Sequence, residues 1–534
     1  MPINSQNIKD VEMQVIDKVG NPVNVMVVKA ALESMGIREK DVIVDYGYYT
    51  LMELAKLVYK SIKQRSPKEV LNINERKPKN LNKSIPISDY LWVKAKLFAK
   101  YYPLGIFHLM PVFIQIASII VYGYSLWTYM GFNIIQSTSV VFGVILGIVL
   151  SGGYVQMLGR QASFYWNHKE YYKTKILTKR LVISGIKGMT AVFAFLLIVN
   201  YVLGTYPTSF VLVTICYGFL IGLLLLVMAP YHAISQRWVI SVVIAVSSLF
   251  ALMLHFYTSF HIYITQWLSI LLAISLSQLY LYLFFKLKIT KDKPENLKPR
   301  QLMVIYKNYP YFFYGILIYI FIFIDRFLAW SADIELNYRY LFLYEKSYEI
   351  GMDLAIVVFF ILVGVMEYAI ASFTKFMDLK QRSIMIVDKH NFGKSLYKNY
   401  KNHVLILFVM LLLVGMFLYC FIINSWGYQT SFGEQIDVLS IRVCVIGGLG
   451  YFFLSWAMLN ALYLFTLNRP NEVLKALIVS SIINFTIGFF ISRWVSYEYS
   501  VVGMLIGSVV FMVYTTNHIK AYFKQLDFYY YAAY

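Results

Sequence analysis

The sequence has few charged residues and few cysteines for its length. Asp, Glu, Lys and Arg make up only 14% of the 534 residues, whereas a soluble domain carries about a quarter. The three cysteines, Cys216, Cys420 and Cys444, lie inside apolar segments without CxxC spacing. Neither a disulfide framework nor a zinc site is therefore indicated. The first residues are polar and mixed in charge, so we expect no signal peptide.

Hydrophobic residues, by contrast, make up 59% of the chain, and they form long apolar runs separated by short charged stretches. This pattern predicts a polytopic membrane protein. The net charge of +20 raises the possibility of a nucleic-acid partner. The basic residues lie in the gaps between apolar runs, where membrane proteins place Lys and Arg for topological reasons. We therefore expect no nucleic-acid binding.

A bilayer core about 30 Å thick requires roughly 20 apolar residues for each helix. Reading the chain for runs of that length predicts twelve transmembrane helices. Their expected ranges are 104–130, 138–159, 181–204, 208–229, 238–257, 262–285, 311–330, 351–374, 403–424, 440–467, 472–491 and 499–519.

The distribution of Lys and Arg predicts how these helices are oriented. The tail and the loops after the even-numbered spans, with their flanking span ends, carry 25 Lys and Arg residues, and the loops after the odd-numbered spans carry 5. Positively charged loops stay on the cytoplasmic side. We therefore expect both termini to lie in the cytoplasm and the protein to reside in the cytoplasmic membrane.

The spans divide into two halves of six. A basic linker at 291–310 separates a first bundle at 89–290 from a second bundle and tail at 311–534. Two six-helix halves around a central linker are typical of alternating-access transporters. Any twelve-span protein can be divided in this way, however, and no residue-level repeat is visible.

Residues 1–88 differ in composition from the rest of the chain. The segment 11–28 is expected to form two short strands about a turn, 41–46 a third strand, and 50–65 an amphipathic helix. A polar linker at 66–86 follows. The pattern predicts a small cytoplasmic α/β module, without a nucleotide-binding loop or metal-ligand spacing, that serves in regulation or docking.

Ionisable residues at bilayer depth are functional candidates, because burying them is costly. Asp325 and Arg326 lie near the outer end of span 7, and Trp330 follows them. Asp353 begins span 8, and Glu367 lies 14 residues later, which places both acids on nearly the same helical face. We expect Glu367 to face an interior cavity whose outer mouth lies near Asp325 and Arg326. The alternative is a structural ion pair between Arg326 and one of the acids.

Two polar residues close span 2. Gln156 and Arg160 lie in the stretch SGGYVQMLGRQASFYWNHKEYY, and Arg160 also fits a simple positive-inside anchor. We add both to the candidate substrate pathway, which then comprises Gln156, Arg160, Asp325, Arg326, Trp330, Asp353 and Glu367. No catalytic residues, metal site or cofactor are expected.

Three stretches resemble one family of the MOP flippase superfamily, the Pel exopolysaccharide transporter PelG family. SGGYVQMLGRQASFYWNHKEYY resembles its span 2 and following loop. IDRFLAW at 324–330, followed by YEIGMDLAIVVFFILVGVMEYAIASF, resembles its Asp-basic-aromatic-Trp motif and acidic eighth span. LYLFTLNRPNEVLKALIVSSIINF at 462–485 resembles the hinge between its spans 10 and 11. The extension at 1–88 has no counterpart there.

The resemblance implies export of a cationic, amino-sugar-rich polysaccharide through a cavity between the two halves. The partners implied are a cytoplasmic glycosyltransferase and other membrane subunits of the Pel system, besides the membrane lipids. Asp325, Asp353 and Glu367 would complement the charge of such a polymer. This electrostatic fit is an inference from the residues and not part of the resemblance.

Other functions compete with polysaccharide export. One is a membrane-embedded polysaccharide polymerase or ligase, but the longest outer loop, at 331–350, shows no recognisable catalytic spacing. An exporter of small molecules or lipid-linked saccharides with a related fold is a second. A scaffold that assembles other subunits is a third.

The predicted topology can be tested with single cysteines in a variant lacking the three native ones. We expect cysteines at Lys291, Lys380 and Lys524 to be protected from an impermeant reagent in intact cells, because basic loops stay in the cytoplasm. A cysteine at Asn337 should react. Labelling of Lys291 and Asn337 positions from the same side of the membrane would contradict the predicted topology.

Overall fold

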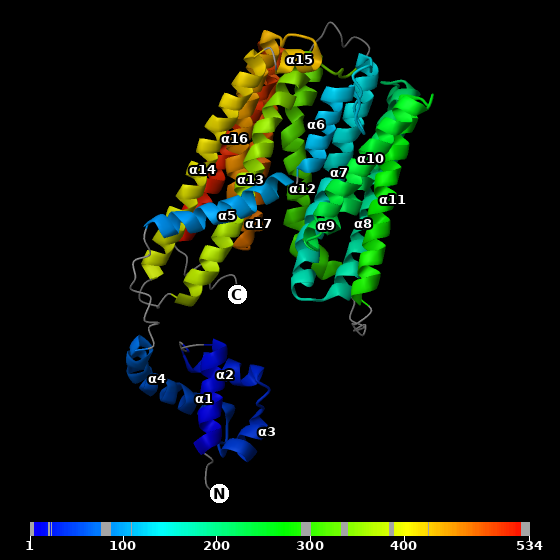
Figure 1. Ribbon diagram of the computed structural model, residues 1–534. Coiled ribbons are helices and arrows are strands. Elements are labelled where there is room, and N and C mark those ends of the chain that lie inside the picture. Colours follow the sequence, from blue (N-terminus) through cyan, green and yellow to red (C-terminus); the bar gives the residue numbers. More distant parts are fainter. Residues whose placement is uncertain are drawn as a thin grey trace. The chain divides into compact units, whose positions relative to one another are not determined.

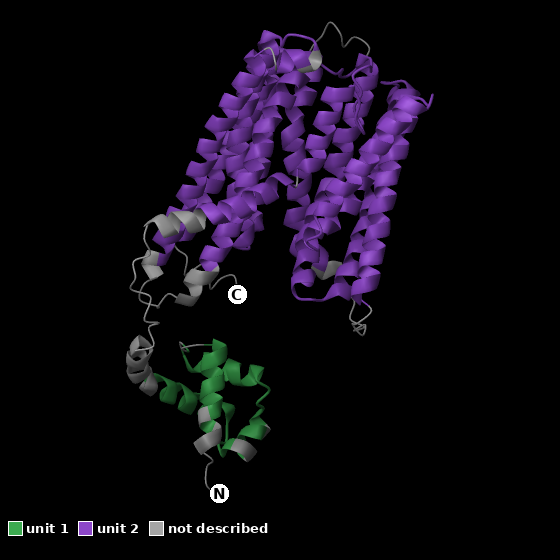
Figure 2. Cartoon of the chain, in the orientation of Figure 1, with its two compact units in different colours: residues 1–94 green, residues 95–534 purple. Residues whose placement is uncertain are grey.

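The computed structural model describes residues 5–19, 22, 24–75, 87–107, 109–289, 301–332, 340–383, 389–424 and 427–524. The chain divides into two compact units, residues 1–94 and 95–534 (Figure 2). Within the described ranges the regular structure is helical, with one isolated β-bridge between Tyr124 and Tyr129.

The first unit is a small helical module and not the α/β module that the sequence suggested. Its elements are α1 (Ser5–Val19), α2 (Val25–Ser34), α3 (Glu39–Asp41), the π-helical turn η1 (Val42–Tyr46) and α4 (Leu51–Glu75). Three of these helices meet in an apolar core that includes the fully buried Val15, Leu32 and Val58.

Helical periodicity explains why the expected strands do not form. Val11 and Val15 are four residues apart and are both buried, which is the spacing of one helical face. The β-branched start of α2 is held in a helix by Asn24, whose side-chain oxygen accepts a hydrogen bond from the backbone N–H of Val27 at 3.0 Å. Gly20 and Asn21, in the expected turn, lie outside the described residues.

The second unit contains eleven helices that are long and apolar enough to cross a membrane. A twelfth span is completed if α5 and α6, which meet at an angle of 56°, count as one. The expectation of an all-α, twelve-span membrane protein is thus confirmed. The helices are α5 (Ile87–Phe107), α6 (Met110–Tyr122), α7 (Ile134–Asn167), α8 (Tyr171–Leu203), α9 (Thr208–Ala233), α10 (Trp238–Tyr257), α11 (Ile262–Ile289), α12 (Gln301–Trp330), α13 (Lys346–Ser383), α14 (Lys389–Ile423), α16 (Val438–Thr466), α17 (Pro470–Trp494) and α18 (Ser500–Lys524), with the short α15 (Tyr428–Phe432) and the 3-10 turn η3 (Tyr497–Tyr499).

These helices form two lobes that lie side by side (Figure 1). The first lobe comprises α6 to α11 and the second comprises α12 to α18, with α16 packed between α13 and α18. We call the end of the bundle at which α7, α9, α11, α13 and α16 finish the basic end, because the Lys- and Arg-rich connections lie there. The other is called the opposite end.

Helix α7 of the first lobe lies against α12 of the second. Their backbones touch at Gly152 and Gly315, and a Cβ atom on Gly152 would lie only 2.5 Å from the carbonyl oxygen of Gly315. Glycine is therefore required for this close approach. The contact fixes where the two lobes meet midway along both helices.

The first span departs most from the sequence-based expectation of 104–130. Helix α6 ends at Tyr122, because Gly123 adopts a left-handed conformation (φ +64°) and its N–H bonds to the carbonyl of Ile119. The loop that follows is held by the buried Gln266, whose side-chain amide donates to the carbonyl oxygen of Ser125 at 2.9 Å. Lipid offers no hydrogen-bond partners to the backbone of such a loop, so the loop depends on internal hydrogen bonds of this kind.

The separate core of the first unit leads to a prediction about truncation. Deletion of residues 1–86 should leave a protein that inserts into the membrane and elutes as a single species from size-exclusion chromatography in detergent. The reason is that the helices of the second unit are apolar enough to insert on their own. Failure of the truncated chain to insert would show that the first unit is part of the membrane fold.

Candidate functional site

A buried charge cluster joins α12 and α13 at the opposite end of the second lobe. Its centre is Arg326, whose guanidinium donates to a carboxylate oxygen of Glu349, and at 3.1 Å to Oδ1 of Asp353. Trp330 is also buried and donates from its indole nitrogen to Glu349 Oε1 at 2.9 Å. We call these four residues, with Asp325 and Tyr348, the charge cluster.

Asp325 lies in the same cluster but points to a different partner. Its Oδ2 accepts a hydrogen bond of 2.7 Å from the hydroxyl of Tyr348, and its buried Oδ1 has no hydrogen-bond partner among the described residues. The cluster therefore contains three carboxyl groups and one guanidinium, and two of the carboxyl groups, those of Asp325 and Glu349, are buried. An excess of buried carboxylates is stable only with a further positive charge, a proton or water.

Glu367 takes part in a second ion pair, at the basic end. Its Oε1 accepts a hydrogen bond of 2.9 Å from Nη1 of Arg237, which immediately precedes α10 of the first lobe. The two side chains are 37% and 32% exposed. This pair thus joins the two lobes, whereas the charge cluster lies within one.

The alternative of an ion pair between Arg326 and an acid applies to Glu349 and Asp353, not to Glu367. Glu349 and Glu367 are 18 residues apart on α13, which corresponds to about 27 Å along the helix. No arginine side chain spans that distance. Glu367 consequently needed a partner from elsewhere in the chain, and Arg237 provides it.

Asp353 and Glu367 lie on one face of α13, as their spacing predicted. About one turn before Glu367, Gly364 packs against α5: a Cβ atom on Gly105 would lie 2.7 Å from Cα of Gly364 and 3.1 Å from Cβ of Glu367. At the other end of this face the Asp353 side chain is 66% exposed. This face of α13 therefore contacts α5 and, through Glu367, the first lobe.

Gln156 and Arg160 lie in α7 where it meets α12. The side chain of Gln156 packs against Gly315, and the guanidinium of Arg160 lies 5.4 Å from the ring centre of Tyr311. The adjacent Gln161 accepts a hydrogen bond of 3.0 Å from Asn308. These residues support the contact between the lobes near the basic end.

The seven residues named from the sequence thus occupy separate places. Asp325, Arg326, Trp330 and Asp353 gather at the opposite end. Gln156 and Arg160 lie at the α7–α12 contact, and Glu367 lies at the α10–α13 contact. Among the described residues, no group of three or more His, Cys, Asp or Glu side chains could hold a metal ion.

Sequence reasoning missed three residues of these contacts. Glu349 and Tyr348 were assigned to the outer loop at 331–350, but α13 begins at Lys346 and includes both. The acidic residue four positions before Asp353, on the same helical face, was the available signal. Arg237 was counted only as a loop charge, and nothing in its surroundings pointed to Glu367.

No protein-family model matches the chain, and no curated protein is significantly similar to it. Solved structures do match. The eukaryotic MATE transporter AtDTX14 is 13% identical over 81% of this chain and 98% of its own, with a TM-score of 0.57. A MOP superfamily transporter from Pyrococcus furiosus is 11% identical over 81% and 97%, with a TM-score of 0.56. A mutant of the Vibrio cholerae MATE transporter VcmN is 12% identical over 82% and 98%, with a TM-score of 0.55.

These similarities assign the fold. The two-lobed arrangement of twelve spans is that of MOP superfamily transporters, as the sequence suggested, and the matches cover nearly the whole length of those proteins. The matches do not single out the PelG family within this superfamily.

The charge cluster predicts a large effect of one substitution on stability. Replacement of Arg326 by glutamine should lower the free energy of unfolding by about 3–5 kcal/mol, because it leaves the buried carboxylate of Glu349 without its counter-charge. The measurement is the melting temperature in detergent together with the amount of protein in the membrane.

Lys346→Gln is the matched control. Lys346 belongs to the same lobe and pairs with Glu434 at 3.0 Å, and both side chains are largely exposed, at 67% and 64%. Such exposed pairs contribute at most about 1 kcal/mol. Equal losses of stability in the two variants would contradict the structural role of the charge cluster.

Proposed function

We propose that this protein is a non-enzymatic exporter that works by alternating access between its two lobes. The basic end faces the cytoplasm, in accordance with the distribution of Lys and Arg. The observation that carries the proposal is the Arg237–Glu367 ion pair, which joins one lobe to the other at that end. In this role the pair is the cytoplasmic gate.

The strength of the two ion pairs supports this division of roles. A gate must open in every transport cycle, so its contacts have to be weak. The Arg237 and Glu367 side chains are about one-third exposed, and pairs with this solvent access contribute about 1 kcal/mol or less. The Arg326 pairs are inside one lobe and need not break during the cycle.

The proposed substrate is an amino-sugar-rich, cationic polysaccharide. This follows from the resemblance of three stretches to the PelG family and from the charge of the pathway. The exposed Asp353 and the gate residue Glu367 lie on the face of α13 that borders the first lobe. Opening the gate would leave two carboxylates on this face, which attract protonated amino groups.

A small cationic molecule is the second candidate substrate. One of the structures with the same fold is described as a multidrug-resistance MATE transporter; it is 12% identical and has a TM-score of 0.53. A carboxylate-lined pathway would serve such a substrate equally well, since fold does not determine substrate. Measuring the export of both substrates from the same cells therefore decides between them.

The proposed partners are a cytoplasmic glycosyltransferase and other membrane subunits of the polysaccharide system. A separate small module at the N-terminus, with its own core, suits docking of such a partner. Loss of a cytoplasmic protein from pull-downs with the truncated chain would support this assignment.

The gate predicts a charge-swap result. Glu367→Gln and Arg237→Gln should each reduce export about fivefold, which corresponds to the loss of about 1 kcal/mol of gate stability. The double variant Arg237→Glu/Glu367→Arg should restore at least half of the export, because the opposite charges meet again. The measurements are the amino-sugar polymer released per cell, efflux of a cationic dye, and the amount of protein in the membrane.

Glu434→Gln is the control, because it removes a negative charge that is not part of the proposed gate. Glu434 pairs with Lys346 at the opposite end, within the second lobe, and both side chains are largely exposed; export should not change. A charge-swap variant as impaired as the single variants would contradict the gate. Loss of dye efflux with normal polymer release would select the small-molecule substrate.

A further inference from the structure

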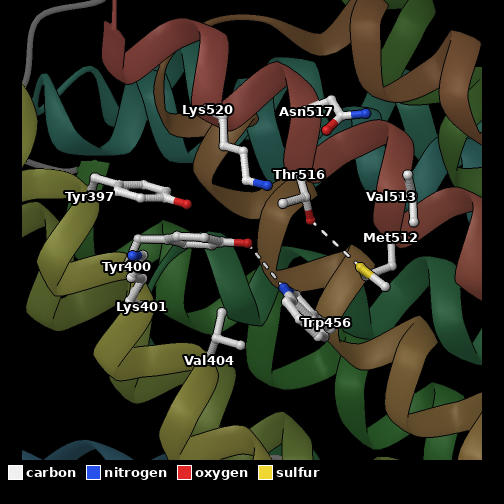
Figure 3. A pocket seen from close by; sticks show the side chains of 10 residues that line it. All are labelled: Tyr397, Tyr400, Lys401, Val404, Trp456, Met512, Val513, Thr516, Asn517 and Lys520. Atoms are coloured by element: carbon white, nitrogen blue, oxygen red, sulfur yellow. Dashed lines mark hydrogen bonds between the residues drawn. The ribbon is translucent and has the colours of Figure 1, made fainter.

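A pocket of about 390 Å³ opens between α14 and α18 of the second lobe, away from the candidate pathway. Tyr397, Lys401 and Val404 line it from α14, and Thr516 and Lys520 line it from α18. Figure 3 shows the amino group of Lys520 and the hydroxyl groups of both tyrosines, Tyr397 and its neighbour Tyr400, pointing into the space between the helices. The volume of the pocket lies in the range of ordinary small-ligand sites.

Hydrogen bonds hold the inner wall of this pocket in place. The buried Tyr400 donates to Oδ1 of Asn460 at 2.8 Å and accepts from the indole nitrogen of Trp456 at 3.0 Å. Asn460 in turn donates to the hydroxyls of Thr515 and Thr516 at 3.1 and 2.9 Å. Three side chains of the wall, Tyr400, Trp456 and Thr516, therefore have fixed positions, and the pocket is preformed.

The charge at the mouth of the pocket is positive. Lys401 and Lys520 are exposed, and the ammonium of Lys401 lies 4.8 Å from the ring centre of Tyr397. The residues that line the pocket include no carboxylate. A ligand with one or two negative charges and several hydrogen-bond acceptors complements this surface.

Both lysines lie where the apolar part of their helix ends. The apolar run of α14 begins at Val404, three residues after Lys401, and its exposed side chains include Leu405, Phe408 and Leu412. Lys401 and Leu412 are separated by about 16 Å along the helix, roughly the depth of one membrane leaflet. An occupant can therefore place a charged head between the lysines and a hydrocarbon chain along α14.

From these features we infer that the pocket binds the phosphate headgroup of an anionic phospholipid from the leaflet at the basic end. The phosphate accepts hydrogen bonds from Lys401 and Lys520, and the remaining headgroup oxygens face Thr516 and the hydroxyl of Tyr397. One acyl chain lies along the exposed apolar side chains of α14. This lipid holds α14 against α18 at the place where these helices leave the membrane, independently of the transported substrate.

The test uses the full-length protein, delipidated in neutral detergent. Phosphatidylglycerol should raise its melting temperature by several degrees and remain bound in native mass spectrometry, whereas phosphatidylcholine should not. Lys401→Gln/Lys520→Gln should weaken phosphatidylglycerol binding at least tenfold. If the double variant is unstable, the single variant Lys520→Gln replaces it, because Lys520 is exposed. This variant should weaken phosphatidylglycerol binding at least threefold.

Lys398→Gln/Lys288→Gln provides the matched control. It removes the same charge at the same end of the bundle, from exposed lysines that do not line the pocket, and should bind phosphatidylglycerol as the wild type does. Equally weakened phosphatidylglycerol binding in both double variants would show that the lipid responds to general surface charge, and it would contradict the proposed site. Equal stabilisation by phosphatidylcholine, or competition by glycerol phosphate at the same concentration as the lipid, would also overturn a phospholipid site.

Discussion

The bilayer offers no hydrogen-bond partners, and this constraint explains most of the polar architecture of the second unit. Buried polar side chains therefore have to find their partners within the protein, and the amides of Gln266 and Asn460 find theirs in other segments of the chain. Gln266 therefore reaches the carbonyl of Ser125, and Asn460 reaches Thr515 and Thr516. Each of these contacts ties together segments that are distant in sequence, so the requirement for satisfied polar groups also specifies how the helices pack.

The same constraint separates the charged residues into two classes. Arg326 and Glu349 are both buried, and removal of one would leave the other as an unpaired charge in a medium of low polarity. Arg237 and Glu367 retain contact with solvent, so that either can lose its partner at little cost. The proposed alternating access needs both classes: rigid lobes keep their shape, and weak contacts between lobes allow them to move against each other.

The α13 helix shows which features of the candidate site could be predicted from the sequence. The 14-residue spacing placed Asp353 and Glu367 on one face, and the structure has them there. The depth and acidity of Glu367 indicated that it needs a partner, but the periodicity of one helix carries no information about the neighbouring chain. Arg237 is 130 residues away in sequence, and only the tertiary fold brings this residue, which immediately precedes α10, into reach of Glu367 on α13. Glu349 was missed for a smaller reason, because hydropathy places the start of a helix within several residues at best.

The sequence by itself determined the class and the number of spans. These properties follow from the length of apolar runs and from where charges can reside, and both are local in sequence. It did not determine the first unit, in which β-branched residues suggested strands, yet the burial of Val11 and Val15 on one helical face prevailed over local propensity. The tertiary structure alone decided which charges pair within a lobe and which pair between lobes, and it alone formed the basic pocket between α14 and α18. Such sites depend on the distance between side chains of different helices, and that distance is set by packing rather than by any local pattern.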